Sequence, residues 1–223
     1  MAKIIHFTRH AQAEHNVAED YSIPDAPLTL LGRRQSEELY SQTVELQKYA
    51  DLLVTSPLKR TLQTTIIGYR GIRTRLENQN PPKPIIVLSH LQEANNLPCD
   101  TGSSREELEQ NDEFKGINFE SLKDDWNSKQ GEHHNALTAR ARWVRRWLRD
   151  RPEQNIVVVA HGDILRRITG IALDGASAWA NAEVRRFTFV DDSDDEAGLV
   201  ALPALTEARA GEEEPTSAQI AKN

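Results

Sequence analysis

Cysteine is nearly absent from this sequence of 223 residues, in which Cys99 is the only one. No disulfide bond can therefore form within the chain, and so low a cysteine content is typical of proteins from reducing compartments. Long apolar runs are also absent, since no segment reaches the length that a membrane-spanning helix needs. The first residues, MAKIIHFTRHA, have too short an apolar stretch for a signal peptide. We therefore expect a cytoplasmic protein that does not contact a membrane.

Patterns for nucleotide and metal binding are missing as well. The sequence contains neither GxGxxG nor GxxxxGK followed by Ser or Thr, which argues against a nucleotide-dependent α/β enzyme. His133 and His134 are adjacent, but no cysteine or third histidine has suitable spacing to complete a metal site with them. The net charge of −7 argues against nucleic-acid binding, which needs a basic face. We expect no metal, no organic cofactor and no nucleic-acid partner.

Strand-like and helix-like patterns alternate along the chain. The run NIVVVA (155–160) is the clearest strand. Thr29 is placed to cap a helix over 29–48, and Pro57 to occupy the first turn of another over 57–70. Alternation of this kind predicts an α/β fold with a mainly parallel sheet. The predicted strands are 3–8, 51–55, 85–89, 155–160, 183–190 and 198–205, and the predicted helices are 29–48, 57–70, 136–150 and 163–172.

Four short segments hold the residues that are suited to chemistry, and each begins where a predicted strand ends. In open α/β sheets, ligand sites gather at the carboxyl ends of the strands. The segments are Thr8-Arg9-His10-Ala11 with Asn16 shortly after it, residues 56–64 (SPLKRTLQT), Leu91-Gln92-Glu93, and Ala160-His161-Gly162. We expect them to bring two histidines, two arginines, one asparagine and one glutamate to one edge of one sheet.

That set of residue types suits a phosphate monoester, which is a dianion near neutral pH. Guanidinium groups such as those of Arg9 and Arg60 match phosphate oxygens with paired hydrogen bonds. A neutral imidazole can attack phosphorus, and nearby positive charge should lower its pKa and keep it unprotonated. The departing alkoxide needs a proton, for which Glu93 is the first candidate and Asp163 its rival. His15 could reach the mouth of the pocket.

Taken in order, these segments resemble the histidine phosphatase superfamily over residues 3–190, and in particular its phosphoglycerate mutase-like branch. The run LPCDTGS (97–103) is similar to one in fungal and plant phosphomutase-like proteins of this branch, and no catalytic role is carried onto it. The family usually has Arg-His-Gly where this chain has Ala11 after the histidine. Gln12 and Ala13 stand where dedicated mutases tend to have Glu-Ser, which favours hydrolysis over mutase chemistry.

The resemblance implies a role for each matching residue. His10 would be the nucleophile that forms a phosphohistidine, and Glu93 would be the proton donor. The residues that bind the phosphoryl group would be Arg9, His10, Asn16, Arg60 and His161. The implied protein is a phosphoric monoester hydrolase that acts on a small-molecule phosphate ester without a metal. The alternatives are phosphoglycerate mutase-type phosphoryl transfer and a non-catalytic phosphate-binding protein on the same fold.

The resemblance also implies a three-layer α/β/α sandwich with a mainly parallel central sheet. One domain would span residues 1–205, and the polar insertion 94–135 would form a small cap over the site. Phe114 and Phe119 in that insertion suggest a substrate pocket with an apolar side. The composition of residues 206–223 is typical of a flexible tail. The natural substrate and the oligomeric state stay open.

Overall fold

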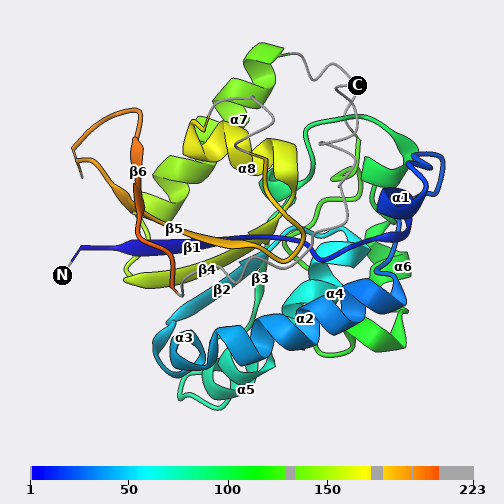
Figure 1. Cartoon of the computed structure of the whole chain (residues 1–223), viewed down its shortest axis with the longest axis horizontal. Helices are drawn as coiled ribbons and strands as arrows, with labels where there is room; N and C mark the ends of the chain where they lie inside the picture. Colours follow the sequence, from blue (N-terminus) through cyan, green and yellow to red (C-terminus); the bar gives the residue numbers. More distant parts are fainter. Residues whose placement is uncertain (1, 129–133, 172–177, 192, 206–223) are drawn as a thin grey trace.

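The computed structural model describes residues 2–128, 134–171, 178–191 and 193–205, and its centre is a six-stranded sheet (Figure 1). The strands are β1 (Ile4–Arg9), β2 (Leu52–Thr55), β3 (Ile86–Val87), β4 (Asn155–Ala160), β5 (Val184–Phe189) and β6 (Leu199–Leu202). Their order across the sheet is β3-β2-β4-β1-β5-β6. The first four in that order run parallel, whereas β5 and β6 are antiparallel to their neighbours. The predicted mainly parallel sheet is confirmed.

Helices cover both faces of this sheet, as the predicted three-layer α/β/α arrangement requires (Figure 1). On one face lie α7 (His134–Arg149) and α8 (Gly162–Thr169). On the other lie α2 (Leu30–Gln42), α3 (Val44–Tyr49), α4 (Lys59–Gly68) and α5 (Arg70–Glu77). The short helices α1 (Glu14–Val17) and α6 (Arg105–Glu109) lie beyond the carboxyl ends of the parallel strands.

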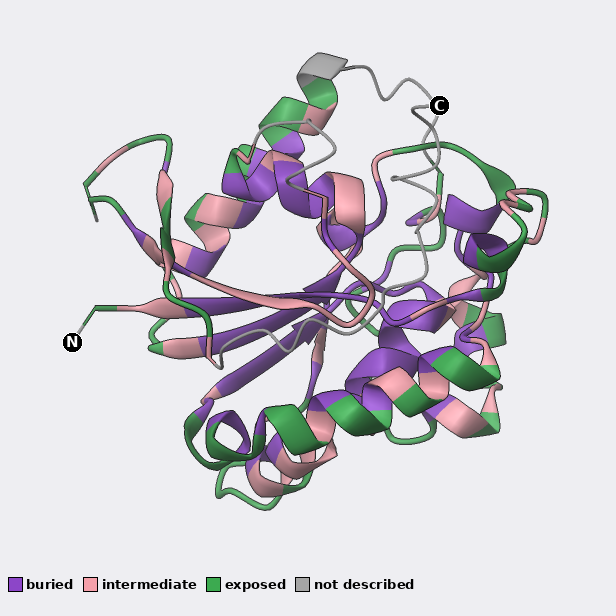
Figure 2. Ribbon diagram, viewed as in Figure 1, coloured by how far each residue is buried: buried purple, intermediate pink, exposed green. Residues whose placement is uncertain are grey.

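The side chains of β4 explain why helices pack on both faces. Successive residues of a strand point to opposite sides of the sheet. Ile156 and Val158 belong to the apolar cluster with α7 and α8, while Val157 and Val159 belong to the cluster with α2, α3 and α5. All four are fully buried, and Figure 2 shows the central strands buried along most of their length. A strand that is apolar on both faces is stable only between two layers.

The predicted helix over 29–48 is divided in the structure. Thr29 caps α2 as predicted, because its Oγ1 accepts the Gly32 N–H at 2.9 Å. The helix ends at Thr43, where φ is −109° and ψ is 22°. The Thr43 hydroxyl donates to the Leu39 carbonyl at 2.7 Å. Such a bond from side chain to backbone competes with regular helical geometry, and the chain resumes as α3 after it.

Other element boundaries also differ from the prediction. Pro57 precedes α4, which begins at Lys59 after the extended residue Leu58, so proline does not occupy the first helical turn. The strand predicted over 85–89 is reduced to β3, because the chain turns into the 3-10 helix η1 (Ser89–Leu91). Helix α5 had no counterpart in the prediction.

The described part of the insertion 94–135 packs its aromatic side chains into the protein. Phe114 and Phe119 are each 2% exposed and form an apolar cluster with Leu58 and Leu62, at the start of α4. The expectation that they line a substrate pocket is therefore wrong, since both are used to attach the insertion to α4. The insertion also contains the 3-10 helices η2 (Pro98–Asp100) and η3 (Asp112–Phe114) and the helix α6.

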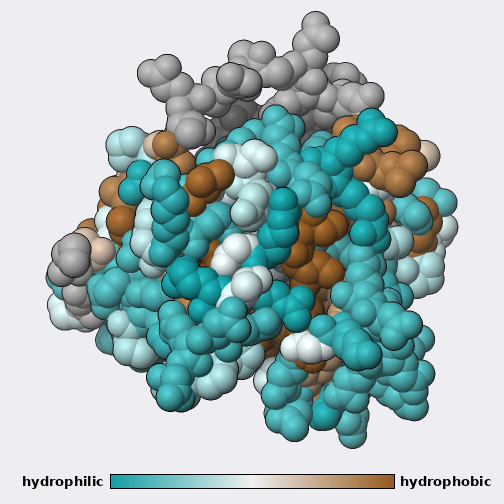
Figure 3. All heavy atoms as spheres, turned by 90° about the horizontal axis from the view of Figure 1, so that it is seen from below, coloured by the Kyte–Doolittle hydropathy of each residue, from teal (hydrophilic) through white to brown (hydrophobic). Residues whose placement is uncertain are grey.

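Some predictions concern residues outside the described part of the chain, namely the tail 206–223, the end of the helix over 163–172, and His133. Among the described residues, no helix has the length and apolar character to cross a membrane. Within the same residues, no group of three or more histidine, cysteine, aspartate or glutamate side chains could hold a metal ion. The face of the molecule that carries α2, α3 and α5 is mostly hydrophilic (Figure 3).

Candidate active site

The parallel pairing of β1 with β4 brings two of the predicted segments together. Arg9 lies opposite Ala160 in the strand register, so His10 and His161 leave two neighbouring strand ends side by side. Their ring centroids are 5.2 Å apart. The exposed fraction is 2% for His10 and 0% for His161, so both imidazoles are removed from bulk water.

The hydrogen bond of the His10 ring determines which nitrogen is free. Nδ1 lies 2.7 Å from the Ala11 carbonyl oxygen, which can only accept, so Nδ1 carries the proton. A neutral ring then has a lone pair on Nε2. Burial lowers the pKa of His10 well below its ordinary value, and the charges of Arg60, Arg9 and His15 add to that effect. The ring is therefore neutral at physiological pH.

His161 has the opposite tautomer. Its Nδ1 accepts a hydrogen bond from Arg60 Nε at 3.2 Å, and an arginine nitrogen can only donate. The proton of the neutral ring is therefore on Nε2, which donates to Ser56 Oγ at 2.8 Å. Ser56 directly follows β2, so the ends of three parallel strands contribute to the arrangement.

Arg60 lies in the first turn of α4 and is 1% exposed. Besides the contact with His161, its Nη1 donates to the Cys99 carbonyl at 2.6 Å and its Nη2 to Asp100 Oδ1 at 2.8 Å. A guanidinium has five N–H groups, so these three contacts leave one N–H on each terminal nitrogen. Asp100 was not predicted as a site residue, since it follows no strand and reaches Arg60 only through the folding of the insertion.

Arg9 is the second buried guanidinium, at 4% exposed. Its Nη1 donates to the Trp179 carbonyl at 2.5 Å, while its Nε has no hydrogen-bond partner among the described residues. Burial lowers the pKa of Arg9 to about 10, although the charges of Glu93 and Asp163 act in the opposite direction. The group is still cationic at neutral pH. A buried donor without a partner is costly unless an anion occupies the site.

Glu93 follows η1 and binds the N-terminus of α8. Its Oε1 accepts from the Ala94 and Ile164 N–H groups at 2.7 and 3.0 Å, and its Oε2 accepts from the Asp163 N–H at 3.3 Å. Glu93 as a whole is 9% exposed. Burial raises the pKa of Glu93 to about 7, with further contributions from Asp163 and Asp100. A carboxyl with that pKa can give and take a proton near neutral pH.

Asp163 remains the alternative proton donor, although its surroundings differ from those of Glu93. Its side chain is 40% exposed, and its Oδ2 accepts from Asn95 Nδ2 at 3.3 Å. Arg166 lies 3.5 Å from the other carboxylate oxygen. The structure therefore presents a buried carboxyl and a partly solvated one at the same helix N-terminus.

Asn16 is brought to the site together with His15. The Ala13 N–H donates to Asn16 Oδ1 at 2.9 Å, which fixes the orientation of the amide. Asn16 Nδ2 then donates to His15 Nε2 at 3.0 Å. The His15 ring lies 5.9 Å from that of His10, and burial lowers its pKa to about 3. His15, for which the sequence left a position at the pocket mouth open, is thus a buried neighbour of His10.

Comparison with known proteins identifies the family. Residues 5–194 match the model of the histidine phosphatase superfamily, branch 1. The chain belongs to the histidine phosphatase superfamily. It is 28% identical over 199 residues to a phosphoglycerate mutase-like protein of Arabidopsis thaliana, which covers 73% of this chain and 72% of that protein. It is 28% identical over 171 residues to a protein of Schizosaccharomyces pombe named as a probable phosphatase, with 74% and 76% covered.

These plant and fungal relatives confirm the predicted branch of the superfamily. Among solved structures, the mycobacterial glucosyl-3-phosphoglycerate phosphatase has a TM-score of 0.55 at 19% identity, covering 90% of this chain and 97% of that one. A phosphoserine phosphatase of Entamoeba histolytica has a TM-score of 0.53 at 17% identity, with 97% and 99% covered. At such identities the likeness shows the shared fold alone. The family assigns the chain to phosphatase or phosphoryl-transfer enzymes.

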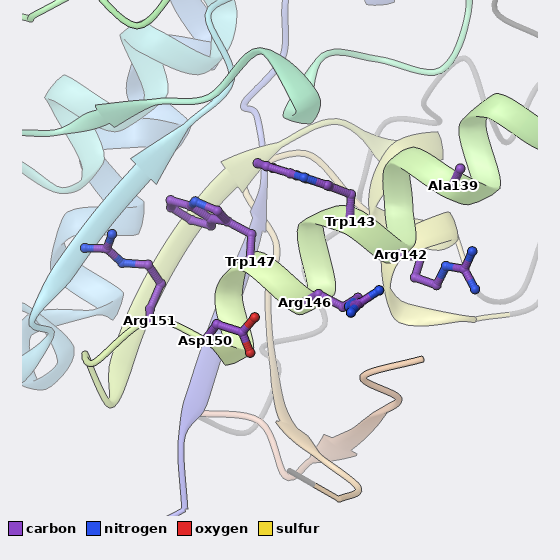
Figure 4. Close-up of a pocket in the computed structure, with 7 residues that line it drawn as sticks. All are labelled: Ala139, Arg142, Trp143, Arg146, Trp147, Asp150 and Arg151. Atoms are coloured by element: carbon purple, nitrogen blue, oxygen red, sulfur yellow. The ribbon is translucent and has the colours of Figure 1, made fainter. Parts of the chain in front are cut away.

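A surface groove along α7 is lined by residues other than those described above (Figure 4). Its volume is about 580 Å³. Trp143, which is 41% exposed, stacks on His90 with ring centroids 3.9 Å apart. None of the predicted site residues belongs to the groove, which is lined by Ala139, Arg142, Trp143, Arg146, Trp147, Asp150 and Arg151.

Proposed function

We propose that this histidine phosphatase hydrolyses a small-molecule phosphate monoester through a phosphohistidine on His10. The observation that carries the proposal is the protonation of the His10 ring. Because Nδ1–H is bound to the Ala11 carbonyl at 2.7 Å, Nε2 has a free lone pair. Burial, and after it the charges of Arg60 and Arg9, keep that ring neutral. A neutral nucleophile beside fixed positive charge suits attack on a phosphate dianion.

In the first step, His10 Nε2 forms a bond to phosphorus while the bond from phosphorus to the ester oxygen breaks. The electron pair of that bond goes to the departing oxygen, and Glu93 supplies the proton that converts it to an alcohol. The His10 ring gains positive charge as the N–P bond forms. The Ala11 carbonyl, which already accepts from Nδ1–H, is positioned to stabilise that charge.

In the second step, the Glu93 carboxylate takes a proton from water as the water oxygen bonds to phosphorus. The N–P bond breaks, its electron pair returns to Nε2, and inorganic phosphate leaves. A pKa near 7 suits both directions of this transfer, because either protonation state of Glu93 is accessible at neutral pH. The proposed mechanism uses neither a metal ion nor an organic cofactor.

The proposed phosphoryl-binding groups supply positive charge that changes little during the reaction. Arg60 has two N–H groups left after its three contacts, and Arg9 Nε has no partner among the described residues. His161 holds Arg60 from one side. Because these groups are oriented before the substrate arrives, stabilisation of the transferring phosphoryl group needs little reorganisation. Asn16 lies at the same site and is assigned an assisting role.

Phosphoglycerate mutase-type transfer is the second candidate, and the names of the plant relatives favour it. A mutase has to retain a second phosphorylated intermediate beside the phosphohistidine. Gln12 is turned toward Thr29, whose hydroxyl donates to Gln12 Oε1 at 2.8 Å, and Ala13 has no polar side chain. Neither residue supplies a group for that retention, which favours release to water. The product distinguishes the candidates, since only hydrolysis yields inorganic phosphate.

The test combines product analysis with a variant of the proposed nucleophile. Purified protein is incubated with a panel of phosphate monoesters, and inorganic phosphate is measured. We expect His10→Ala to lose at least about 10³-fold in kcat and to form no acid-labile phosphoenzyme from a ³²P-labelled substrate. The matched control is His6→Val, because His6 is also fully buried on β1 but contacts Tyr49. Substantial turnover by His10→Ala, or interconversion of phosphoglycerates without phosphate release, would contradict the proposal.

A further inference from the structure

Asp100 is an unexpected group in a site for anions. The residue is 4% exposed, and its carboxylate lies 2.8 Å from Arg60 Nη2. A buried carboxylate repels a phosphate dianion and so weakens substrate binding. A structural role of Asp100 therefore has to compensate for this repulsion. Removal of one member of a buried ion pair is strongly unfavourable, because the other charge is left without compensation.

The segment that carries Asp100 is firmly attached to α4. Asp25 Oδ1 accepts from the Lys59 N–H, and its Oδ2 accepts from the Ser103 N–H, each at 2.9 Å. The Cys99 N–H donates to the Tyr21 carbonyl at 3.1 Å. One buried carboxylate therefore joins the start of the helix that holds Arg60 to the loop that holds Asp100. The distance between the two partners of the ion pair is set by this frame.

The orientation of the Arg60 guanidinium follows from three contacts at three different nitrogens. Nε is bound to His161, Nη1 to the Cys99 carbonyl and Nη2 to Asp100. The Asp100 contact is the only one of the three in which donor and acceptor both carry a charge, so it is an ion pair as well as a hydrogen bond. Without it, the guanidinium has a neutral acceptor on each of its other two nitrogens and more freedom to rotate.

We propose that Asp100 is a positioning residue of the catalytic centre, which holds the Arg60 guanidinium against His161. This inference rests on the proposed function of the site. The electrostatics of the site agree with this role, since the charge of Asp100 also contributes to the raised pKa of Glu93, after burial and Asp163, while Arg60 acts in the opposite direction. The loop at 97–103 thus acts on the reaction through two other side chains.

Two substitutions separate the two effects. Asp100→Ala removes both the acceptor and the charge, whereas Asp100→Asn keeps an oxygen acceptor for Arg60 and removes only the charge. We expect Asp100→Ala to lower kcat about 10-fold or more, because a small misplacement of a phosphoryl-binding group is costly. Asp100→Asn should recover most of that kcat. In both variants the alkaline limb of kcat/KM should move to lower pH, by about half a unit.

The dependence on Arg60 is tested by a double-mutant cycle with Arg60→Ala. If Asp100 acts through Arg60, Asp100→Ala should change kcat less than about 2-fold in the Arg60→Ala background. The matched control is Asp112→Asn, an exposed carboxylate of the same insertion, which should leave both kcat and the pH profile unchanged. The position of a pH limb does not depend on the fraction of folded enzyme, so partial misfolding of a variant cannot imitate the expected shift.

The proposal is overturned if Asp100→Ala keeps kcat within 2-fold of the parent protein and the same pH limb, or if its loss of kcat is undiminished in the Arg60→Ala background. The outcome is separable from the fate of the proposed function. If His10→Ala is inactive and the Asp100 variants behave like the parent protein, only the positioning role fails. If His10→Ala retains turnover, the proposed function itself fails.

Discussion

The pKa of Glu93 leads to a specific prediction about Glu93→Gln. If protonated Glu93 is the acid of the first step, kcat/KM has to fall as pH rises through about 7. About half of the side chains are protonated at pH 7 and about one in ten at pH 8, so kcat/KM should drop roughly 5-fold over that interval. Glu93→Gln cannot donate, and this alkaline limb should disappear with it.

The size of the decrease in kcat/KM caused by Glu93→Gln should depend on the leaving group of the substrate. General acid catalysis is worth about 10²–10⁴-fold, so we expect Glu93→Gln to lose at least about 100-fold on an alkyl phosphate. p-Nitrophenyl phosphate releases a stable anion that needs no proton. With that substrate, the rate of phosphorylation of the enzyme should therefore decrease much less in Glu93→Gln. The assay is phosphate release and p-nitrophenol release from pH 5 to 9, with burst kinetics used to separate phosphorylation from hydrolysis of the phosphoenzyme.

Asp163→Asn is the matched control, because Asp163 lies at the same helix N-terminus but is partly solvated. It should keep most of the activity and retain the alkaline limb, displaced to lower pH by the loss of a neighbouring negative charge. An alkaline limb that persists in Glu93→Gln and vanishes in Asp163→Asn would refute the assignment and make Asp163 the acid. Equal losses on both substrates in Glu93→Gln would also count against a role in proton donation.

Three further predictions concern inhibition and stability. Vanadate, which mimics a pentacoordinate phosphorus, should inhibit, while EDTA should not; strong EDTA inhibition that added metal reverses would contradict the mechanism. Burial lowers the pKa of His6 from its ordinary 6.5 to about 4, so the contribution of the neutral ring to the free energy of unfolding is complete above pH 6.5 and is lost as pH falls toward 4. His6→Val should therefore reduce the loss of stability over that interval by about 3 kcal/mol. Urea titrations at several pH values measure this, and an unchanged pH dependence would contradict it. Phe114→Ala should lower the free energy of unfolding by about 3–5 kcal/mol, since Phe114 is buried in the cluster that attaches the insertion to α4, whereas a loss below about 1 kcal/mol would contradict that packing.

Most of the sheet could be predicted because its strands are short apolar runs with clear ends. The run at 155–160 is apolar at every position that contacts a helix layer, and it became β4 with the predicted bounds. Helix α5 was missed because only Ile72 and Leu76 are buried along it, which is too sparse a pattern to stand out. The break at Thr43 depends on a hydrogen bond of its own side chain, which spacing of apolar residues does not reveal.

The order of short motifs along the chain was sufficient to predict the convergence of His10, Arg60 and His161. Each follows a strand, and parallel strands end at one edge, so sequence position alone implies proximity. The order of these motifs was also sufficient to predict the family, which the match over residues 5–194 confirms. The roles of the individual side chains in the reaction stay predictions that the variants above test.

Only the tertiary structure decided the protonation pattern of the site and the surroundings of its charges. The Ala11 carbonyl selects the tautomer of His10, and the N-terminus of α8 binds the Glu93 carboxylate. Asp100 meets Arg60 across 40 residues of sequence, from the end of the short 3-10 helix η2, which no pattern in the sequence predicts. Periodicity and strand ends are local properties that a sequence displays directly, whereas hydrogen-bond partners and burial depend on which distant segments the packed core brings together.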